Sequence, residues 1–141
     1  MISAAEDVGM ADPQALVVAS AAAQAVERVG MPEAQIILAE AVNYIACAPK
    51  SNASCLSIGA AMESVKNRKT TVPPHLQDAH YKGSAKLGHG VGYKYAHDYP
   101  EHYVKQQYLP TEIEGERFYC PTDIGYEKQA GERIERLRNR E

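Results

Sequence analysis

The sequence has few cysteines, no long apolar run and no excess of positive charge. Its main apolar stretch, residues 15–26, is interrupted by Ser20 and Gln24, so no membrane-spanning helix of about 18 residues or more is expected. No basic segment follows Met1, so we expect no signal peptide. The formal net charge of −3 argues against a dedicated nucleic-acid-binding protein, which is usually clearly basic.

The three cysteines, Cys47, Cys55 and Cys120, form no CxxC pair and are odd in number. In a chain of this size they are typical of reduced thiols in the cytoplasm, and we expect them to be small buried core residues.

The first half of the sequence has the pattern of consecutive helices. Asp12 before Pro13 is a typical helix start, and Gly30 a typical stop, so a first helix is expected over about 13–29. It is apolar on most sides and therefore has to be covered on more than one side. A second helix is expected from Pro32 or Glu33 to just before Pro49.

A third helix is expected from about Ser51 or Asn52 to about Arg68. Its apolar side chains form one row at helical spacing: Cys55, Ile58, Met62 and Val65. Three helices with short links predict an antiparallel helical array.

The second half is irregular and then closes with a helix. Two prolines in 70–74 exclude a continuous helix there, and 79–87 has the composition of a short helix. A closing helix is expected over about 122–138, because Ala130, Ile134 and Leu137 recur at helical spacing. The predicted fold class is therefore all-α, with regular helices over about 13–68 and an irregular Tyr- and Gly-rich region over about 69–121.

The stretch from Gly88 to Pro110 contains three glycines, five tyrosines, three histidines and two prolines, which suits neither a helix nor a strand. We expect an ordered loop near a subunit contact, held by buried tyrosine rings and by hydroxyl groups bonded to the backbone. The candidate structural residues are Tyr93, Tyr95, His97, Asp98, Tyr99, Pro100 and Tyr108. A DNA- or partner-binding module stays open as an alternative, with the tyrosines for stacking and a positive face formed by Lys82, Lys86, Lys94 and Lys105.

No catalytic, cofactor-binding or metal-binding residue is predicted. The segment 83–90 mimics a phosphate-binding loop but has His89 and Gly90 where that loop needs Lys and Ser or Thr. The five histidines lack the spacing of a zinc site. A small metal-dependent enzyme using His89, His97 and Asp98 is kept as a second alternative.

The chain resembles the C-terminal domain of the RarA/MgsA family, the replication-associated recombination ATPases related to Werner helicase-interacting protein. The resemblance extends from Ser3 to about Arg138 and is densest where Gly92-Tyr93-Lys94-Tyr95-Ala96-His97-Asp98-Tyr99-Pro100 is followed by Tyr108-Leu109-Pro110. Further matching segments are 6–13, 21–27, 29–33, 48–52, 75–79, Phe118-Tyr119 and Pro121-Thr122.

The resemblance implies a division into the end of an AAA+ lid over 1–12 and an oligomerisation domain over 13–141, similar to the clamp-loader collar. It implies a homotetramer in the cytoplasm, within a parent protein that binds ATP and Mg²⁺, hydrolyses ATP in response to DNA, and acts at stalled replication forks. It also implies DNA and single-strand-binding protein as partners of that parent. This chain has no Walker A, Walker B or arginine-finger motif that we can identify, so we expect no catalysis and no membrane contact from it.

Overall fold

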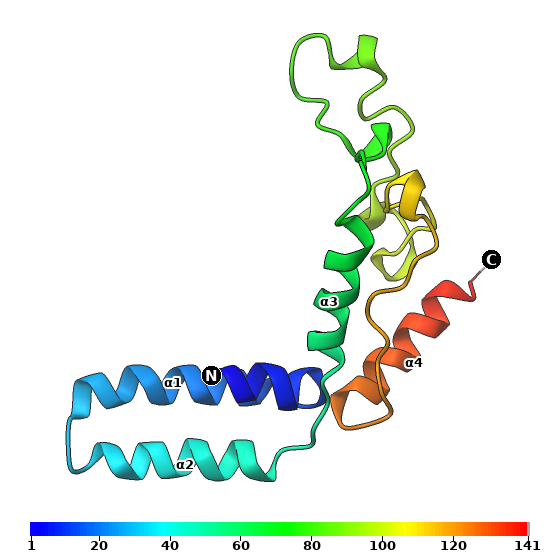
Figure 1. Ribbon diagram of the computed structural model, residues 1–141. Helices are drawn as coiled ribbons and strands as arrows, with labels where there is room; N and C mark the ends of the chain where they lie inside the picture. Colours follow the sequence, from blue (N-terminus) through cyan, green and yellow to red (C-terminus); the bar gives the residue numbers. More distant parts are fainter. Residues whose placement is uncertain (141) are drawn as a thin grey trace. The chain divides into compact units, whose positions relative to one another are not determined.

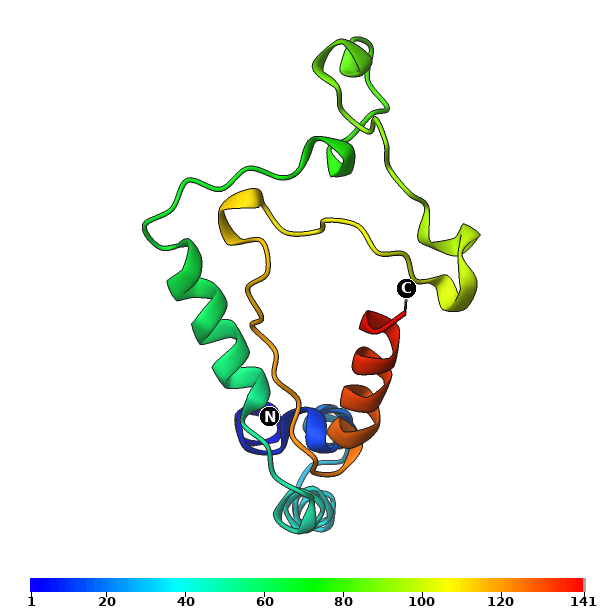
Figure 2. The ribbon, with the colours of Figure 1, turned by 90° about the vertical axis from the view of Figure 1, so that its right-hand side faces the viewer.

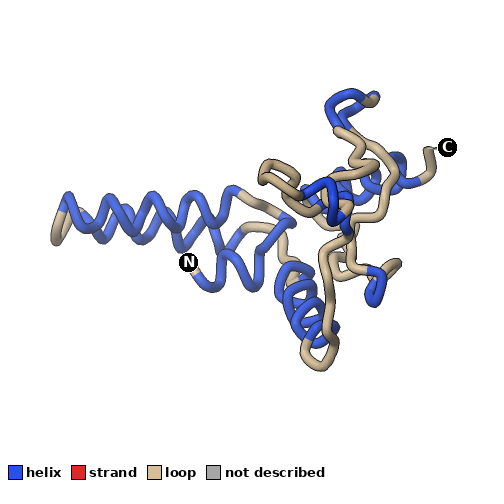
Figure 3. The backbone as a smooth tube through the Cα atoms, turned by 90° about the horizontal axis from the view of Figure 1, so that it is seen from above, coloured by secondary structure: helices blue, strands red, loops and turns tan. Residues whose placement is uncertain are grey.

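The computed structural model describes residues 1–140, and over these residues the chain is all-α with no strand (Figures 1 and 3). This confirms the predicted fold class. The α-helices are α1 (Gln14–Val29), α2 (Ala34–Cys47), α3 (Ala53–Val65) and α4 (Tyr126–Arg138). A π-helical segment, Ala4–Val8, precedes them. The chain divides into a helical unit, residues 1–60 with 118–139, and a second unit, residues 61–117 with Arg140.

Helix α1 begins and ends where local chemistry dictates. The Asp12 carboxylate accepts a hydrogen bond from the Gln14 backbone N–H at 3.1 Å and one from the Tyr44 hydroxyl at 2.8 Å. Gly30 ends the helix with a φ of 75°, a conformation that favours glycine, and its N–H bonds to the Val26 carbonyl. The predicted bounds of this helix are therefore confirmed.

Helices α1 and α2 form an antiparallel pair in the helical unit (Figure 1). Figure 2 views the pair nearly along its axes, with the N-terminal segment beside α1. The core between these elements consists of Ala4, Val8, Ala15 and Ala19, with Ile45 and Ala48 of the α2 end packed against it. Alanine at most of these positions allows the helix backbones to approach closely.

Helix α3 begins at a cap supplied by Ser51. The Ser51 hydroxyl accepts a hydrogen bond from the Ala53 N–H at 3.2 Å, and the Ser51 N–H donates to the Asp7 carbonyl at 2.8 Å. These bonds tie the α2–α3 link to the end of the N-terminal segment. The helix ends at Val65, three residues before the expected end.

Helix α4 starts four residues later than expected. Gly125 has a φ of 56° and lies so close to the Ala11 carbonyl that a β-carbon would approach that oxygen to 2.1 Å. The four residues 122–125 therefore form a turn that leads into the helix. Leu137, near the other end of α4, is buried.

The second unit consists of loops and short 3₁₀ turns, including Pro74–Leu76, Ser84–Leu87, Ala96–Asp98, Pro100–His102 and Thr111–Ile113. The expected helix over 79–87 is present only as the 3₁₀ turn Ser84–Leu87, because Gly83 has a φ of 102°. Two bonds to the Glu116 carboxylate help hold this unit: Ser64 Oγ donates to it at 2.6 Å, and the Arg68 guanidinium pairs with it. These two donors hold the pKa of Glu116 below its usual value.

Across residues 1–140, no helix combines the length and the apolar character needed to cross a membrane.

Candidate functional site

In the helical unit most of the buried apolar residues are alanines, and many of the large apolar side chains are turned outward. Of the twelve buried hydrophobic residues among those described, eight are alanine. In contrast, Ile36 is 71% exposed and Val42 is 63% exposed. Other exposed large side chains on α1 and α2 are Leu16, Val17, Val29, Leu38 and Tyr44. This distribution is the reverse of an ordinary core, since isoleucine and valine are among the most often buried residue types.

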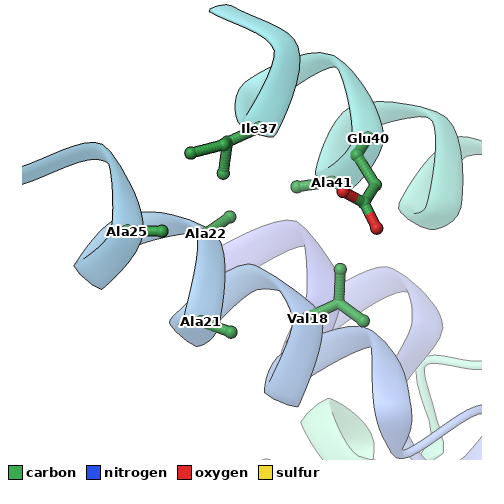
Figure 4. A pocket seen from close by; sticks show the side chains of 7 residues that line it. All are labelled: Val18, Ala21, Ala22, Ala25, Ile37, Glu40 and Ala41. Carbon is green, nitrogen blue, oxygen red and sulfur yellow. The ribbon is translucent and has the colours of Figure 1, made fainter. Parts of the chain in front are cut away.

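A groove runs between α1 and α2 (Figure 4). Its volume is about 310 Å³. Small side chains form most of its walls, and the lining residues are Val18, Ala21, Ala22, Ala25, Ile37, Glu40 and Ala41. Among these seven described lining residues, Glu40 is the only one with an ionisable side chain, and its carboxylate projects toward the side of Val18 in Figure 4.

A second, shallower hollow of about 390 Å³ follows α1, and Ala21 lines both. Its other lining residues are Pro13, Leu16, Val17, Ser20 and Gln24. The sequence predicts that this helix is apolar on most sides but does not predict the groove, because a groove depends on how α2 lies against α1.

Helix α3 carries the apolar row predicted from the sequence, which runs from Cys55 to Val65. The structure places this row outward: Ile58 is 61% exposed, Met62 is 65% exposed and Val65 is 42% exposed. Cys55, in the same row, is exposed as well. The opposite face, which is turned inward, carries Ala53, Ser57, Ala61 and Ser64. We call the outward row, Cys55, Ile58, Met62 and Val65, the α3 stripe.

The expectation of buried cysteines is wrong. All three, Cys47, Cys55 and Cys120, are exposed. Cys55 belongs to the α3 stripe and Cys47 is the last residue of α2, so the burial expected from residue type is overridden by the small core of this unit.

The buried carboxylate of Glu127 is a feature that sequence reasoning missed. Glu127 is fully buried in the first turn of α4. It accepts hydrogen bonds from the Ser51 hydroxyl at 2.8 Å, the Thr122 hydroxyl at 2.7 Å, the Thr122 N–H at 2.9 Å and the Tyr119 hydroxyl at 3.0 Å. The only signal in the sequence is an acidic residue in the first turn of a helix, which is common on helix surfaces.

The donors decide the ionisation of Glu127. Burial alone would raise its pKa, but the hydrogen bonds from Thr122, Ser51 and Tyr119 outweigh burial and hold the pKa below the usual value. Burial, with the hydrogen bond to Glu127 and its negative charge, raises the pKa of Tyr119 to about 12. The group is therefore a charged carboxylate that joins three segments of the helical unit: the α2–α3 link, the irregular segment 118–122 and α4.

The structure brings some of the expected loop residues together. The rings of Tyr95 and His97 lie 5.0 Å apart and those of His97 and His102 lie 4.9 Å apart. The side-chain amide of Gln106 donates to the Lys94 carbonyl at 3.0 Å and to the Tyr108 hydroxyl at 3.2 Å. Of the candidate tyrosines, Tyr108 also donates to a backbone carbonyl, that of Val104, at 3.1 Å.

The candidate tyrosine rings are more exposed than a buried-ring loop requires. Tyr93 is 50% exposed, Tyr95 53%, Tyr99 38% and Tyr108 49%. Asp98 and Pro100 are exposed in the same segment. Lys82, Lys86, Lys94 and Lys105 are exposed, and none of them forms an ion pair with another residue of the described chain. The rings and lysines are thus available on the surface of the second unit.

Within residues 1–140, no three His, Cys, Asp or Glu side chains gather in an arrangement that would hold a metal ion. His89 is instead bonded to the Tyr81 hydroxyl at 2.6 Å, and His97 lies between two aromatic rings.

Comparison with known proteins places the chain in a family. Residues 1–138 match the family model described as MgsA AAA+ ATPase C terminal. An AAA domain-containing protein of Mycobacterium tuberculosis is 52% identical over 98% of this chain and 31% of its own length. Replication-associated recombination protein A of Bacillus subtilis is 45% identical over 89% of this chain, and that of Escherichia coli is 43% identical over 93%.

The chain spans about a third of the length of these relatives, at 30% to 31% of each. The resemblance seen in the sequence is confirmed, and the match covers all four α-helices and the tyrosine-rich loop. The chain therefore belongs to the RarA/MgsA family of AAA+ ATPases and corresponds to the family's C-terminal domain.

Proposed function

We propose that this chain is an assembly domain that joins copies of an AAA+ ATPase into a homotetramer and performs no catalysis itself. The single observation that carries the proposal is the reversed burial of the helical unit, with alanines inside and large apolar side chains outside. Exposed apolar area of this extent marks a surface that another protein covers.

The total accessible surface supports this reading. The chain exposes 10204 Å². A compact monomer of 15.4 kDa exposes about 7,200 Å², and two separate globules of the sizes of the two units would expose about 8,600 Å². The excess of at least about 1,600 Å² per chain is about twice the roughly 800 Å² that each partner buries in a stable interface of standard size, so it is enough for two interfaces.

Assembly through this domain sets the number and the arrangement of the ATPase modules in the parent protein. In this proposal the parent binds ATP and Mg²⁺ outside this chain, acts on DNA in the cytoplasm, and contacts single-strand-binding protein. The relatives named for replication-associated recombination support this placement. A tetramer multiplies weak DNA contacts through effective concentration. In this role the chain would resemble the collar domain that holds the subunits of a clamp loader together.

Light scattering behind a sizing column, over a dilution series, tests the proposal. We expect a stable species of about 62 kDa, four times the 15.4 kDa chain. A monomer at every concentration would overturn it.

A second candidate function is a contact to single-stranded DNA by the second unit. The observation that favours it is the exposure of four tyrosine rings beside lysines without ion-pair partners in the described chain. Tyrosines stack on bases and lysines contact phosphates, and such binding weakens as salt rises. Fluorescence anisotropy with a labelled oligothymidine at low and moderate salt tests it, and no binding at low salt removes it.

A further inference from the structure

The exposed apolar area of the helices is divided between two unlike surfaces. One is the α1–α2 groove, concave and lined mostly by small side chains. The other is the α3 stripe, which carries larger side chains on a convex helix face. We propose that the α3 stripe of one copy packs into the α1–α2 groove of a second copy. This inference rests on the proposed assembly function and names the surfaces that carry it.

The groove has the form of a receptor for a helix. Val18, Ala21, Ala22 and Ala25 of α1 recur at helical spacing along one wall, and Ile37 and Ala41 of α2 form part of the other. Small residues permit a partner helix to approach to the 8–10 Å that packed helix axes require. The volume of about 310 Å³ is about twice that of a ~150 Å³ cavity that holds one benzene molecule. The groove therefore has room for two or three large apolar side chains.

The α3 stripe has the form of a matching ridge. Its four residues recur at intervals of three, four and three along one helix face, and none carries a charge. Met62 is unbranched and adaptable, which suits it to fill an irregular groove in a partner. A ridge of large side chains against a wall of small ones is the arrangement by which packed helices interdigitate.

A second copy is the occupant that the observations favour. Every copy carries both surfaces, so repeated head-to-tail contacts cover one groove and one stripe on each subunit, and they form a closed ring when the rotation from one subunit to the next closes, as the proposed tetramer requires. With interfaces of standard size, each subunit of such a ring buries two different patches of about 800 Å² each, and the whole chain's excess of about 1,600 Å² is enough for both. A contact of groove with groove would instead bring two Glu40 carboxylates together, and like charges are unfavourable across an interface.

Disulfide cross-linking tests the contact, because Cys55 already lies in the stripe. The test variant carries Ala21→Cys in the groove, with Cys47→Ser and Cys120→Ser to remove the other thiols. After mild oxidation, a non-reducing gel is expected to show a ladder of covalent multimers that reduction returns to the monomer. A mixture of chains that carry only the groove thiol with chains that carry only Cys55 is expected to stop at two covalently joined chains.

Two control variants complete the test. Adding Cys55→Ser to the test variant is expected to abolish the ladder, and covalent dimers in that control would show groove against groove instead. Ala25→Leu narrows the groove without a thiol and is expected to weaken association at unchanged helix content by circular dichroism.

The outcomes separate this inference from the function on which it rests. An oligomeric native chain without cross-links between the groove thiol and Cys55 would overturn the inference and leave the assembly function standing. A monomeric native chain would overturn both.

Discussion

The two units of the chain expose apolar side chains in different ways. In the helical unit, exposed residues lie at regular spacing on straight helices, around an alanine core. In the second unit, exposed tyrosines lie on an irregular backbone with only a few buried residues, among them Val104 and Ile113. A regular apolar face suits rigid packing against another helix, whereas scattered rings suit stacking or local hydrogen bonding. The comparison therefore supports the proposal that the helices carry the assembly contacts and that the loop makes contacts of another kind.

The largest expected effect is on the backbone junction that holds the helical unit together. Gly125→Ala places a β-carbon against the Ala11 carbonyl at a φ of 56°, and we expect a loss of at least about 3 kcal/mol in unfolding free energy. Gly59→Ala is the matched control, because no atom lies within 4 Å of its β-carbon position in α3. It is expected to stabilise the chain by about 0.5–1 kcal/mol. Urea denaturation of both variants measures the difference, and equal effects would contradict this account of the junction.

The next effect concerns the hydrogen bonds of Glu127. Glu127→Ala leaves the Ser51, Thr122 and Tyr119 hydroxyl groups without their shared acceptor, and we expect a loss of about 2–3 kcal/mol. Glu132→Ala, at an exposed position of the same helix, is expected to change stability by less than about 0.5 kcal/mol. Denaturant unfolding checks both, and a small loss for Glu127→Ala would show that the buried carboxylate contributes little.

A smaller effect is expected on the pH dependence of the free energy of unfolding. The pKa of Glu127 is lowered in the folded chain, so its contribution is present above the usual carboxyl pKa of 4.5 and is lost as pH falls through the lower folded value. Glu127→Gln is expected to make stability less sensitive to pH below about 4.5. Melting temperatures measured between pH 6 and pH 3 test this, and identical slopes for the native and variant chains would rule it out.

The smallest effect on stability is expected in the second unit. Replacing Tyr93 and Tyr95 by alanine removes rings that are 50% and 53% exposed, so we expect a change of less than about 1 kcal/mol. The same variant is expected to lose most of any binding to oligothymidine, because stacking contributes about 1–3 kcal/mol per base. A large fall in melting temperature would instead return these rings to the structural role expected from the sequence.

The sequence predicts the helices better than it predicts their surroundings. Asp12, Pro13 and Gly30 determine α1 locally, so its bounds follow from residue chemistry. The row from Cys55 to Val65 is also evident at helical spacing, but spacing does not distinguish a core face from an outward face. Whether such a row is buried depends on partners, and the inward face of α3 is formed by alanines and serines instead.

Long-range contacts are the part that the sequence does not specify. Glu127 bonds to Ser51, 76 residues earlier, and the groove exists because Ile37 and Ala41 lie across from Ala22 and Ala25. Gly125 shows the same limit, since its close approach to Ala11 makes the helix start four residues later than expected. Local propensity carries no information on such approaches.

The solution masses of two variants test the central claim most directly. Leu56 and Ile58 are 63% and 61% exposed on the same helix, but only Ile58 belongs to the α3 stripe. Light scattering is expected to give a monomer of 15.4 kDa for Ile58→Glu and the native oligomeric mass for Leu56→Glu, with equal helix content. A native mass for Ile58→Glu would contradict the claim that the α3 stripe holds the copies together.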